Sequence, residues 1–410
     1  MSVSHTPTAR VGEPVATAAP APRHWLRAGW LMTASGWSAN QYSSLLGAYR
    51  AHLGLTAATT TALFAVYVLG LIPALLVGGP LADRHGRRRV ARTALGLSAL
   101  ATCLLMAGPA VPALLWPGRF LTGVGAGTLL TAGSVWIKEL STPPHGTAPS
   151  PGAAARRSGL FLSAGFATGG LAASLIAQWA PLPMVLAYVP HLVLSAAAAL
   201  SAARAPETAP PRSPHTAVAE PAAHRAPFRR LVVPVAPWVF AAPSIAFAVL
   251  PALVDGRLHG WGTVYAGIVT AVTPGAGLLV APLARRLSAR HRLAAAATGL
   301  LVTAVGLLVG ALAVAHAQPV VALFAAALLG AGYGLCVAYG LTEVAALAPP
   351  HHLARLTARF WALCYLGFLA PYGVTLLTGA FAPSTILTGV AALALLALAV
   401  LLRPGARSSA

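Results

Sequence analysis

The chain has 410 residues, of which 57% are hydrophobic and only 8% are charged. A typical soluble domain carries about 25% charged residues, so a soluble fold of this size could not hide so much apolar surface. The composition indicates a protein that crosses a membrane many times. The net charge of +20 would suit a nucleic-acid-binding protein, but the distribution of the basic residues argues against nucleic acid as a partner.

The chain begins with residues 1–25, which are rich in Pro, Ala and Thr and contain no apolar core. We predict a disordered tail here and not a cleaved signal peptide. Twelve apolar runs follow, each near the roughly 20 residues that a helix needs to cross a bilayer. The predicted transmembrane helices are residues 26–48, 60–79, 90–109, 113–137, 158–178, 183–202, 231–251, 263–283, 293–314, 319–342, 358–379 and 384–402.

These runs divide into two groups of six. We expect an N-terminal six-helix bundle at residues 26–202 and a C-terminal one at residues 231–402. Residues 203–230 between them are rich in Pro, Ala, His and Arg without helical periodicity, and predict a flexible linker. Residues 403–410 form a short C-terminal tail.

The basic residues fall almost entirely on one side of the predicted helices. Of the 27 Lys and Arg, only Arg50, Arg119 and Arg257 lie outside the N-terminal tail, the connections after helices 2, 4, 6, 8 and 10, and the C-terminal tail. Basic residues near helix ends resist translocation. We therefore expect a multi-pass protein of the plasma (inner) membrane, with both termini, the linker and these connections in the cytoplasm.

The connection after the second helix carries a motif. It reads Gly79-Pro80-Leu81-Ala82-Asp83-Arg84-His85-Gly86-Arg87-Arg88-Arg89. This segment resembles the loop 2–3 motif of the major facilitator superfamily of secondary transporters. The resemblance implies an all-α membrane fold with two six-helix bundles and a substrate site between them.

The same resemblance implies a latch that holds the outward-open state. Asp83 would face the start of the eleventh helix, near Arg355 to Arg359, and Arg87 would pair with Glu139. The simpler interpretation is that the arginines only fix the topology. The residues with a predicted gating role are Gly79, Asp83, Arg84, Gly86, Arg87 and Glu139.

The two halves repeat each other. Pro80-Leu81-Ala82-Asp83-Arg84 recurs as Pro282-Leu283-Ala284-Arg285-Arg286, without the acid. Four glycines of the fourth helix, which begin at Gly123, recur in the tenth helix from Gly330. The repeat predicts two bundles related by a pseudo-two-fold axis along the membrane normal. We expect the glycines to allow close helix packing, because small residues let backbones approach.

A substrate cavity is predicted from polar and aromatic residues within the helices. Trp37, Asn40 and Gln41 lie on an unusually polar first helix, which should line a cavity or bond to neighbouring helices. Arg119 lies inside the fourth helix, where a cation is costly, and should face the cavity or a partner or extend to the outer interface. Tyr365 and Phe368 follow helical spacing in the eleventh helix. An aromatic cavity with few polar groups suits hydrophobic ligands.

Proton coupling has few candidate residues. None of the seven acidic residues lies near the middle of a predicted helix. His191 in the sixth helix and Glu343 at the end of the tenth are the remaining candidates, although a structural role for His191 is the more usual one. Gly165 and Gly169 fit the superfamily's antiporter motif in the fifth helix, but Gly170 replaces its proline.

These observations favour an exporter of small hydrophobic or amphipathic molecules that works by alternating access and proton antiport. The alternatives are an uptake permease or uniporter for a sugar or other metabolite, a membrane enzyme, and a sensor that does not transport. The predicted helices contain no paired carboxylates, metal-ligand spacing or nucleophile-base motif, so we expect no enzyme activity, catalytic residue, metal or cofactor. The expected partners are a small-molecule substrate, protons and the lipid bilayer, and the protein is expected to be a monomer.

Overall fold

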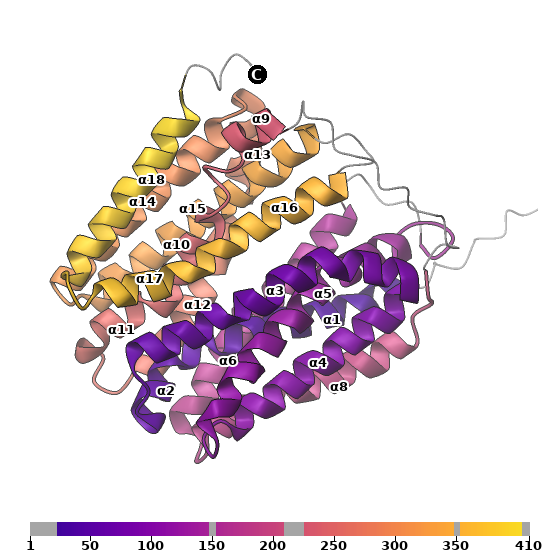
Figure 1. Ribbon diagram of the computed structural model, residues 1–410, viewed down its shortest axis with the longest axis horizontal. Helices are drawn as coiled ribbons and strands as arrows, with labels where there is room; N and C mark the ends of the chain where they lie inside the picture. Colours follow the sequence, from indigo (N-terminus) through magenta and orange to yellow (C-terminus); the bar gives the residue numbers. More distant parts are fainter. Residues whose placement is uncertain (1–22, 147–152, 209–224, 348–352, 404–410) are drawn as a thin grey trace, which may run out of the picture.

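A computed structural model of the chain describes residues 23–146, 153–208, 225–347 and 353–403. In these residues, eleven helices are long and apolar enough to cross a membrane. The predicted first helix is not among them because its serines, asparagine and glutamine lower its hydropathy, yet α1 and α2 occupy most of its range. Figure 1 shows the helices as two bundles that lie side by side, the N-terminal one in indigo to magenta and the C-terminal one in rose to yellow.

The observed helices agree with the predicted ones to within a few residues at most ends. The N-terminal bundle contains α1 (His24–Gln41), α2 (Leu46–Leu53), α3 (Ala57–His85), α4 (Arg87–Ala107), α5 (Leu115–Leu140), α6 (Ala153–Trp179), α7 (Pro183–Leu186) and α8 (Val189–Ala203). The C-terminal bundle contains α9 (Arg225–Leu231), α10 (Trp238–Ala248), α11 (Leu250–Val254), α12 (Gly262–Leu279), α13 (Ala281–Arg290), α14 (Ala294–Ala315), α15 (Pro319–Leu347), α16 (Leu353–Leu366), α17 (Ala370–Leu377) and α18 (Pro383–Leu401).

Close packing explains the repeated glycines. A methyl group on Gly123 of α5 would lie 2.0 Å from the carbonyl oxygen of Tyr67 in α3. A methyl group on its counterpart Gly330 of α15 would lie 2.0 Å from the carbonyl oxygen of Thr273 in α12. Only a hydrogen fits at such a distance, so the two backbones touch at both places. The packing role expected for these glycines is confirmed.

The first helix of each half is broken at the same place in the repeat. Helix α1 ends at Gln41, and a 3₁₀ turn (Ser43–Leu45) separates it from α2. Helix α10 ends at Ala248, and Pro251 lies in the first turn of α11. The two C-caps, Tyr42 and Val249, are 207 residues apart, the same offset as between Gly123 and Gly330. In the first half the break precedes Ser43, whose side chain is buried.

The predicted linker and tails need correction. Residues 203–208 pack against the N-terminal bundle, and residues 225–230 belong to α9, so neither end of the predicted linker is a free chain. The rest of the linker, residues 209–224, lies outside the described residues, as do residues 1–22 and 404–410 of the predicted tails. The predicted N-terminal tail ends early, because α1 begins at His24.

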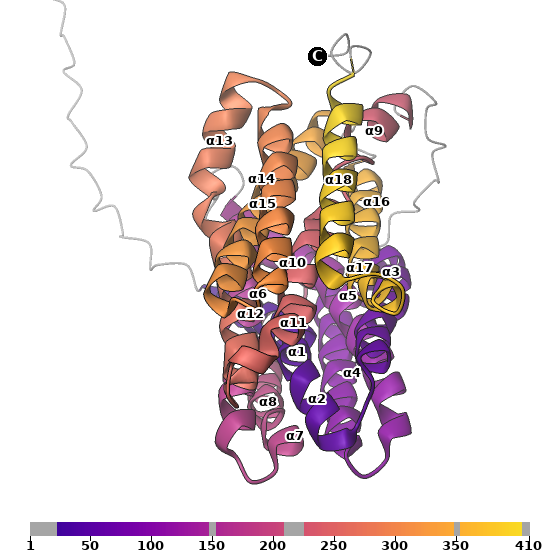
Figure 2. The same cartoon turned by 90° about the vertical axis from the view of Figure 1, so that its left-hand side faces the viewer.

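The two bundles meet mainly away from the arginines of the motif. We call the end of the molecule that carries Arg87, Arg292 and α9 the arginine-rich end. At the opposite end, Gln178 Nε2 donates to the carbonyl oxygen of Gly260 at 3.0 Å, and the rings of Trp179 and Trp261 meet edge to face at 6.0 Å. Figure 2 shows α11 and α12 of the C-terminal bundle reaching down beside α1 and α2 at this end.

Candidate substrate pocket and charge network

A pocket lies between the two bundles, near the middle of the molecule. The N-terminal bundle contributes the strongly polar residues of the pocket lining, and the C-terminal bundle contributes mostly aromatic residues. Its volume is about 40 Å³, far below the roughly 300–1,000 Å³ of a ligand site. The residues that line it are Ala39, Asn40, Ser43, Phe64, Tyr67, Arg119, Phe166, Phe240, Pro243, Phe247, Pro274, Tyr333 and Phe368.

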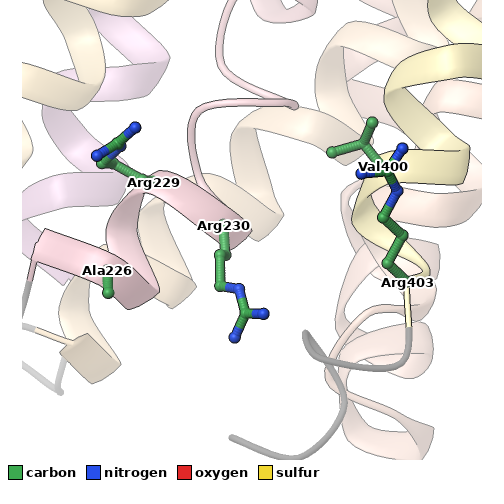
Figure 3. Close-up of a pocket in the computed structure, with 5 residues that line it drawn as sticks. All are labelled: Ala226, Arg229, Arg230, Val400 and Arg403. Carbon is green, nitrogen blue, oxygen red and sulfur yellow. The ribbon is translucent and has the colours of Figure 1, made fainter.

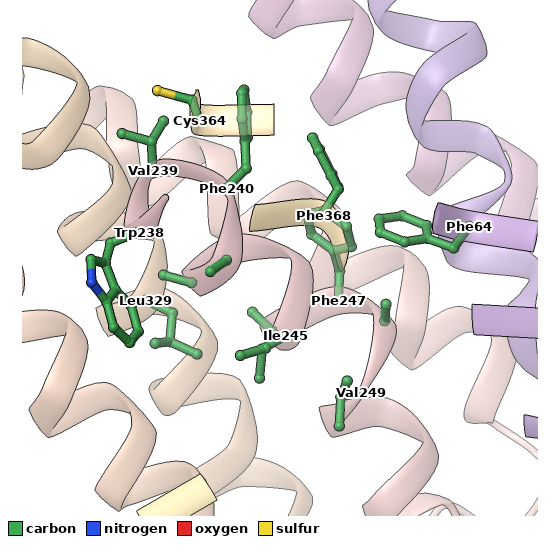
Figure 4. Packing of buried hydrophobic residues seen from close by; sticks show 14 of the residues in the cluster. Phe64, Trp238, Val239, Phe240, Ile245, Phe247, Val249, Leu329, Cys364 and Phe368 are labelled. Carbon is green, nitrogen blue, oxygen red and sulfur yellow. The ribbon is translucent and has the colours of Figure 1, made fainter. Parts of the chain in front are cut away.

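Stacked aromatic rings fill the space where a ligand would lie. Phe240 of α10 stacks on Tyr365 and Phe368, with ring centroids 4.5 and 4.8 Å apart. Phe64 of α3 reaches across from the other bundle, 5.3 Å from Phe368 and 6.1 Å from Phe247. Figure 4 shows Phe64 and Phe368 facing each other across this boundary. Tyr365 contributes to the stack behind Phe240 and, contrary to prediction, does not line the pocket itself.

Among the residues that the structure describes, Arg119 is the only charged one that lines this pocket. Its side chain is fully buried, so it does not extend to the interface. Its Nε donates to the carbonyl oxygen of Leu63 at 3.2 Å, and its guanidinium carbon lies 4.3 Å from the ring centre of Tyr42 and 5.1 Å from that of Tyr67. These rings stabilise the cation through their faces. Its Nη1 is buried without a hydrogen-bond partner among the described residues.

The polar residues of the first helix point in different directions. Asn40 lines the pocket and donates from Nδ2 to the carbonyl oxygen of Phe166 at 2.7 Å. Gln41, one residue further and about 100° around the helix, turns into the N-terminal bundle, where its Nε2 lies 3.4 Å from Thr102 Oγ1. Trp37 packs against Gly169 of α6. The structure therefore places neither Trp37 nor Gln41 in the predicted cavity lining.

Ser43 also lines the pocket, although the sequence pointed to its neighbours. It follows the end of α1 in the 3₁₀ turn and is 1% exposed. Its hydroxyl oxygen, like Arg119 Nη1, is buried without a hydrogen-bond partner in the part of the chain that the structure describes. Ser43 belongs to the polar run of the first helix, but the break that turns it inward could not be located from sequence periodicity.

A charge network occupies the arginine-rich end. Arg87 Nη1 lies 2.5 Å from Asp83 Oδ1, one turn away across Gly86, and Arg87 Nη2 lies 3.3 Å from Glu139 Oε1 on α5. Glu139 also accepts a hydrogen bond from the hydroxyl of Thr208 at 2.5 Å. The structure thus contains the contact between Arg87 and Glu139 that the resemblance implies. None of these residues belongs to the C-terminal bundle.

Glu207 joins this network, a role the sequence did not predict. Its carboxylate accepts hydrogen bonds from the backbone N–H of Arg87 at 2.7 Å and of Arg88 at 3.1 Å, and so caps the first turn of α4. A carboxylate at this position satisfies free N–H groups and is favoured by the helix dipole. Gly86 has φ +94°, and a methyl group there would lie 2.6 Å from Glu207 Oε2. The glycine of the motif is therefore required both for the turn and for the cap.

The other predicted gating residues have fewer contacts. Arg84 is exposed, and a methyl group on Gly79 would meet no atom within 4 Å. Asp83 contacts Arg87, and among the described residues no hydrogen bond or ion pair links it to the start of α16. Helix α3 meets the C-terminal bundle through Phe64 and Tyr67, both of which contact Phe368. Phe64 is roughly 28 Å from Asp83 along the helix axis at 1.5 Å per residue.

The C-terminal bundle has an ion pair of its own. Arg292, just before α14, donates from Nε and Nη2 to Glu343 of α15, at 3.0 and 2.5 Å. The Glu343 side chain is only 3% exposed. These hydrogen bonds raise the pKa of the Arg292 guanidinium above its ordinary value. Glu343, predicted as a proton carrier, is thus half of a buried pair near the arginine-rich end.

His191 lies inside the N-terminal bundle. Its Nδ1 is 2.8 Å from the hydroxyl of Thr102, and its Nε2 is 3.1 Å from that of Ser195. Both ring nitrogens therefore have a partner, and the ring is fully buried. His191 does not line the pocket between the bundles.

A second hollow, of about 400 Å³, lies at the arginine-rich end between α9 and the end of α18. Figure 3 shows its lining residues Ala226, Arg229, Arg230, Val400 and Arg403. Its three arginines give this surface a positive charge. None of its lining residues belongs to the N-terminal bundle, so it is separate from the pocket between the bundles.

Comparison with known proteins identifies the fold and the family. Structures similar to this chain include a POT family peptide transporter in complex with sulfate (TM-score 0.77, 15% identity, 94% of this chain and 95% of that one). They also include a D-xylose-proton symporter (TM-score 0.71, 16% identity, 93% and 97%). A further one is a POT family transporter in complex with 5-aminolevulinic acid (TM-score 0.73, 12% identity, 93% and 96%). At these identities the likeness shows a shared fold.

Among curated proteins, the 3-(3-hydroxy-phenyl)propionate transporter of Escherichia coli (strain K12) is 41% identical to this chain over 71 residues. That match spans 17% of this chain and 17% of the relative. The family model described as Major Facilitator Superfamily matches residues 28–371. This range is most of the chain and includes the motif around Asp83. The resemblance seen in the sequence is confirmed, and the chain belongs to the major facilitator superfamily of transporters.

Proposed function

We propose that this protein carries small, mostly apolar organic molecules across the plasma (inner) membrane, and that it exports them in exchange for protons. The pocket between the bundles is the observation that supports this substrate class. Its walls are largely aromatic, with Arg119, Asn40 and Ser43 as its few strongly polar groups. Such a lining binds a ligand mainly by burying apolar surface, at about 25 cal/mol per Å².

The pocket volume supports alternating access as the mechanism. At about 40 Å³ the pocket cannot hold such a molecule while Phe240, Phe368 and Phe64 remain in contact. A rocking of one bundle against the other would separate Phe64 from Phe368 and open the space. In this cycle the arginine-rich end faces the cytoplasm, together with both termini, and a single copy of the chain suffices.

The predicted latch fits this cycle as a contact that forms and breaks. Asp83 would meet the start of α16 when the cytoplasmic side closes, and Arg87, held by Glu139, would keep the loop in position for that contact. Asp83 is 40% exposed in the present arrangement, so it is accessible to a partner on the other bundle. Gly86 and Arg84 belong to the same turn, and Gly79 lies just before it.

Proton coupling would have to act outside the pocket, because no carboxylate of the described residues lines it. Glu343 is the better supported of the two candidates. Protonation would remove its negative charge and release Arg292, which would change how α14 and α15 are held together. His191 is bonded to two hydroxyl groups of its own bundle, an arrangement that suits a structural role.

The relative in Escherichia coli supports an aromatic substrate, because the molecule in its name contains a phenyl ring. The match covers 17% of the chain, so it supports the class of compound and not its identity.

The test is transport by the purified protein in proteoliposomes with an imposed pH gradient. The panel contains a lipophilic cation, an aromatic antibiotic, 3-phenylpropionate and a neutral sugar, each offered to wild type and to Asp83→Asn. Gradient-driven export of an aromatic compound that is lost in the variant would support antiport and the latch. Movement down the compound's own gradient, unaffected by pH, would refute antiport and indicate a uniporter. Accumulation of the sugar alone would indicate an uptake permease.

A further inference from the structure

We infer that the pocket recognises an organic anion, and that Arg119 and Ser43 bind its carboxylate while the aromatic residues bind its apolar part. This inference rests on the proposed function, because it names the substrate class of the same pocket. It goes further in requiring a negative charge on the substrate. A neutral or cationic apolar molecule would then be a poor ligand.

The first observation is that Arg119 has no negatively charged side chain beside it among the described residues. Arg119 is completely buried and is the only charged residue in the pocket lining as far as the chain is described. The five acidic residues within the described part of the chain lie elsewhere. Asp83, Glu139 and Glu207 belong to the network at the arginine-rich end, Glu343 pairs with Arg292, and Asp255 lies at the end of α11. The cation therefore has aromatic faces and one carbonyl beside it, but no carboxylate.

The second observation is that two polar atoms of the lining residues have no hydrogen-bond partner in the described part of the chain. Arg119 and Ser43 both line the pocket, and Arg119 Nη1 and Ser43 Oγ are both buried without a hydrogen-bond partner among the described residues. Leaving a buried polar group without a partner costs roughly 1–3 kcal/mol, and more for a charged group. Arginine can only donate, and a serine hydroxyl can donate as well. Two unpartnered donors on residues that line one pocket, one of them a cation, match an acceptor with a negative charge.

The rest of the lining restricts the anion to one with an aromatic or other apolar body. Phe64, Phe240, Phe247 and Phe368 surround the pocket, and Tyr67 lies between Phe368 and Arg119. An inorganic anion has no apolar surface that could pack against these rings. An arylalkanoate such as 3-phenylpropionate has the required ring and carboxylate separated by a short chain. It is the simplest probe of this inference.

The experiment compares ligands that differ only in charge. Binding of 3-phenylpropionate, 3-phenylpropionamide and 3-phenylpropylamine to the purified full-length protein in lipid nanodiscs is measured by equilibrium dialysis. We expect wild type to bind the carboxylate at least tenfold more tightly than the amide, because hydrogen bonds to charged groups are stronger than neutral ones. The amine should bind more weakly still. Arg119→Gln should abolish the preference, and Arg119→Lys should retain part of it.

Ser43 has a matched control in Ser38, five residues earlier on α1. Ser43→Ala should weaken carboxylate binding several-fold. Ser38→Ala should leave it unchanged, because Ser38 is equally buried but bonds to the carbonyl oxygen of Ser35 in its own helix at 2.9 Å. Equal effects of the two alanine substitutions would remove Ser43 from the site. If Arg119→Gln retains the preference for the carboxylate, Arg119 is not part of the anion site.

Failure of this inference can be told apart from failure of the proposed function. If none of the three probes binds, or if the amide binds as tightly as the carboxylate, the pocket does not select an anion and the inference is overturned. Transport of lipophilic cations or neutral aromatic compounds by the same preparation would then leave the transport function standing. If the folded protein moves none of the compounds, the proposed function of the pocket fails as well.

Discussion

Replacing Arg87 by alanine tests whether the charge network does more than set the topology. The substitution removes the partner of Glu139, whose side chain is 27% exposed, and of Asp83, which is 40% exposed. Breaking a fully buried ion pair costs roughly 3–5 kcal/mol, while an exposed pair contributes roughly 0–1 kcal/mol. Because both acids retain access to water and Glu139 keeps its bond from Thr208, we expect an intermediate loss of about 2 kcal/mol. The Glu207 cap should remain, since it binds the backbone of Arg87.

The matched control is Arg89→Ala, which removes the same charge from the same loop at an exposed position. In thermal unfolding in detergent, the Tm of Arg87→Ala should decrease by roughly 4–8 °C. The free energy of unfolding of Arg89→Ala should stay within about ±0.5 kcal/mol of wild type. Transport in proteoliposomes should fall about tenfold in the first variant only, equivalent to about 1.4 kcal/mol. If the two variants lose stability and transport equally, the arginines act as a topology signal and the network has no separate role.

Three further predictions follow from the contacts. Gly123→Ala should destabilise the protein by roughly 1–3 kcal/mol in thermal unfolding, because the added methyl group overlaps the α3 backbone. The control Gly96→Ala, whose methyl group meets no atom within 4 Å, should be neutral or stabilising by up to about 1 kcal/mol. A Gly123→Ala variant more stable than wild type would contradict the packing role of Gly123. Glu207→Gln should cost about 1 kcal/mol and speed hydrogen exchange at the first amides of α4, and unchanged exchange would show that the cap is dispensable. Glu343→Gln should remove the pH dependence of transport, whereas His191→Gln should keep that dependence. Loss of the pH dependence in His191→Gln alone would make His191 the proton carrier.

The sequence was enough to predict the fold because membrane burial leaves a strong signal. Each helix must satisfy its own backbone groups in lipid, so the apolar runs mark the helices directly. The glycines that begin at Gly123 and Gly330 revealed the repeat, and the structure explains them by backbone contact at 2.0 Å in both halves. The first helix was predicted from its length and position among the twelve runs, although its polar residues keep it out of the eleven described helices that are apolar enough to cross a membrane.

The site was only partly predictable, because side-chain direction inside a bundle depends on neighbouring helices. Arg119, Asn40 and Phe368 line the pocket as expected, whereas Gln41 turns to Thr102 and Tyr365 packs behind Phe240. One helix position separates Asn40 from Gln41, and no composition rule decides which of them faces the cavity. The role of Glu207 was missed for a different reason. It requires a residue after α8 to reach α4 through the tertiary fold.

The kinds of contact within and between the bundles favour rocking over internal deformation. Within a bundle, ion pairs such as Arg87–Glu139 and backbone contacts such as Gly123–Tyr67 lose their energy when they are displaced by an ångström or two. Between the bundles, Phe64 meets Phe368 through dispersion contacts that are individually small and non-directional, and the hydrogen bond from Gln178 to Gly260 lies at the end where rocking would pivot. A rigid-body motion therefore breaks the weaker set. It also leaves Arg119 and Ser43 together, because both belong to the N-terminal bundle. The aromatic wall of the C-terminal bundle would then close over an anion that these two residues already hold.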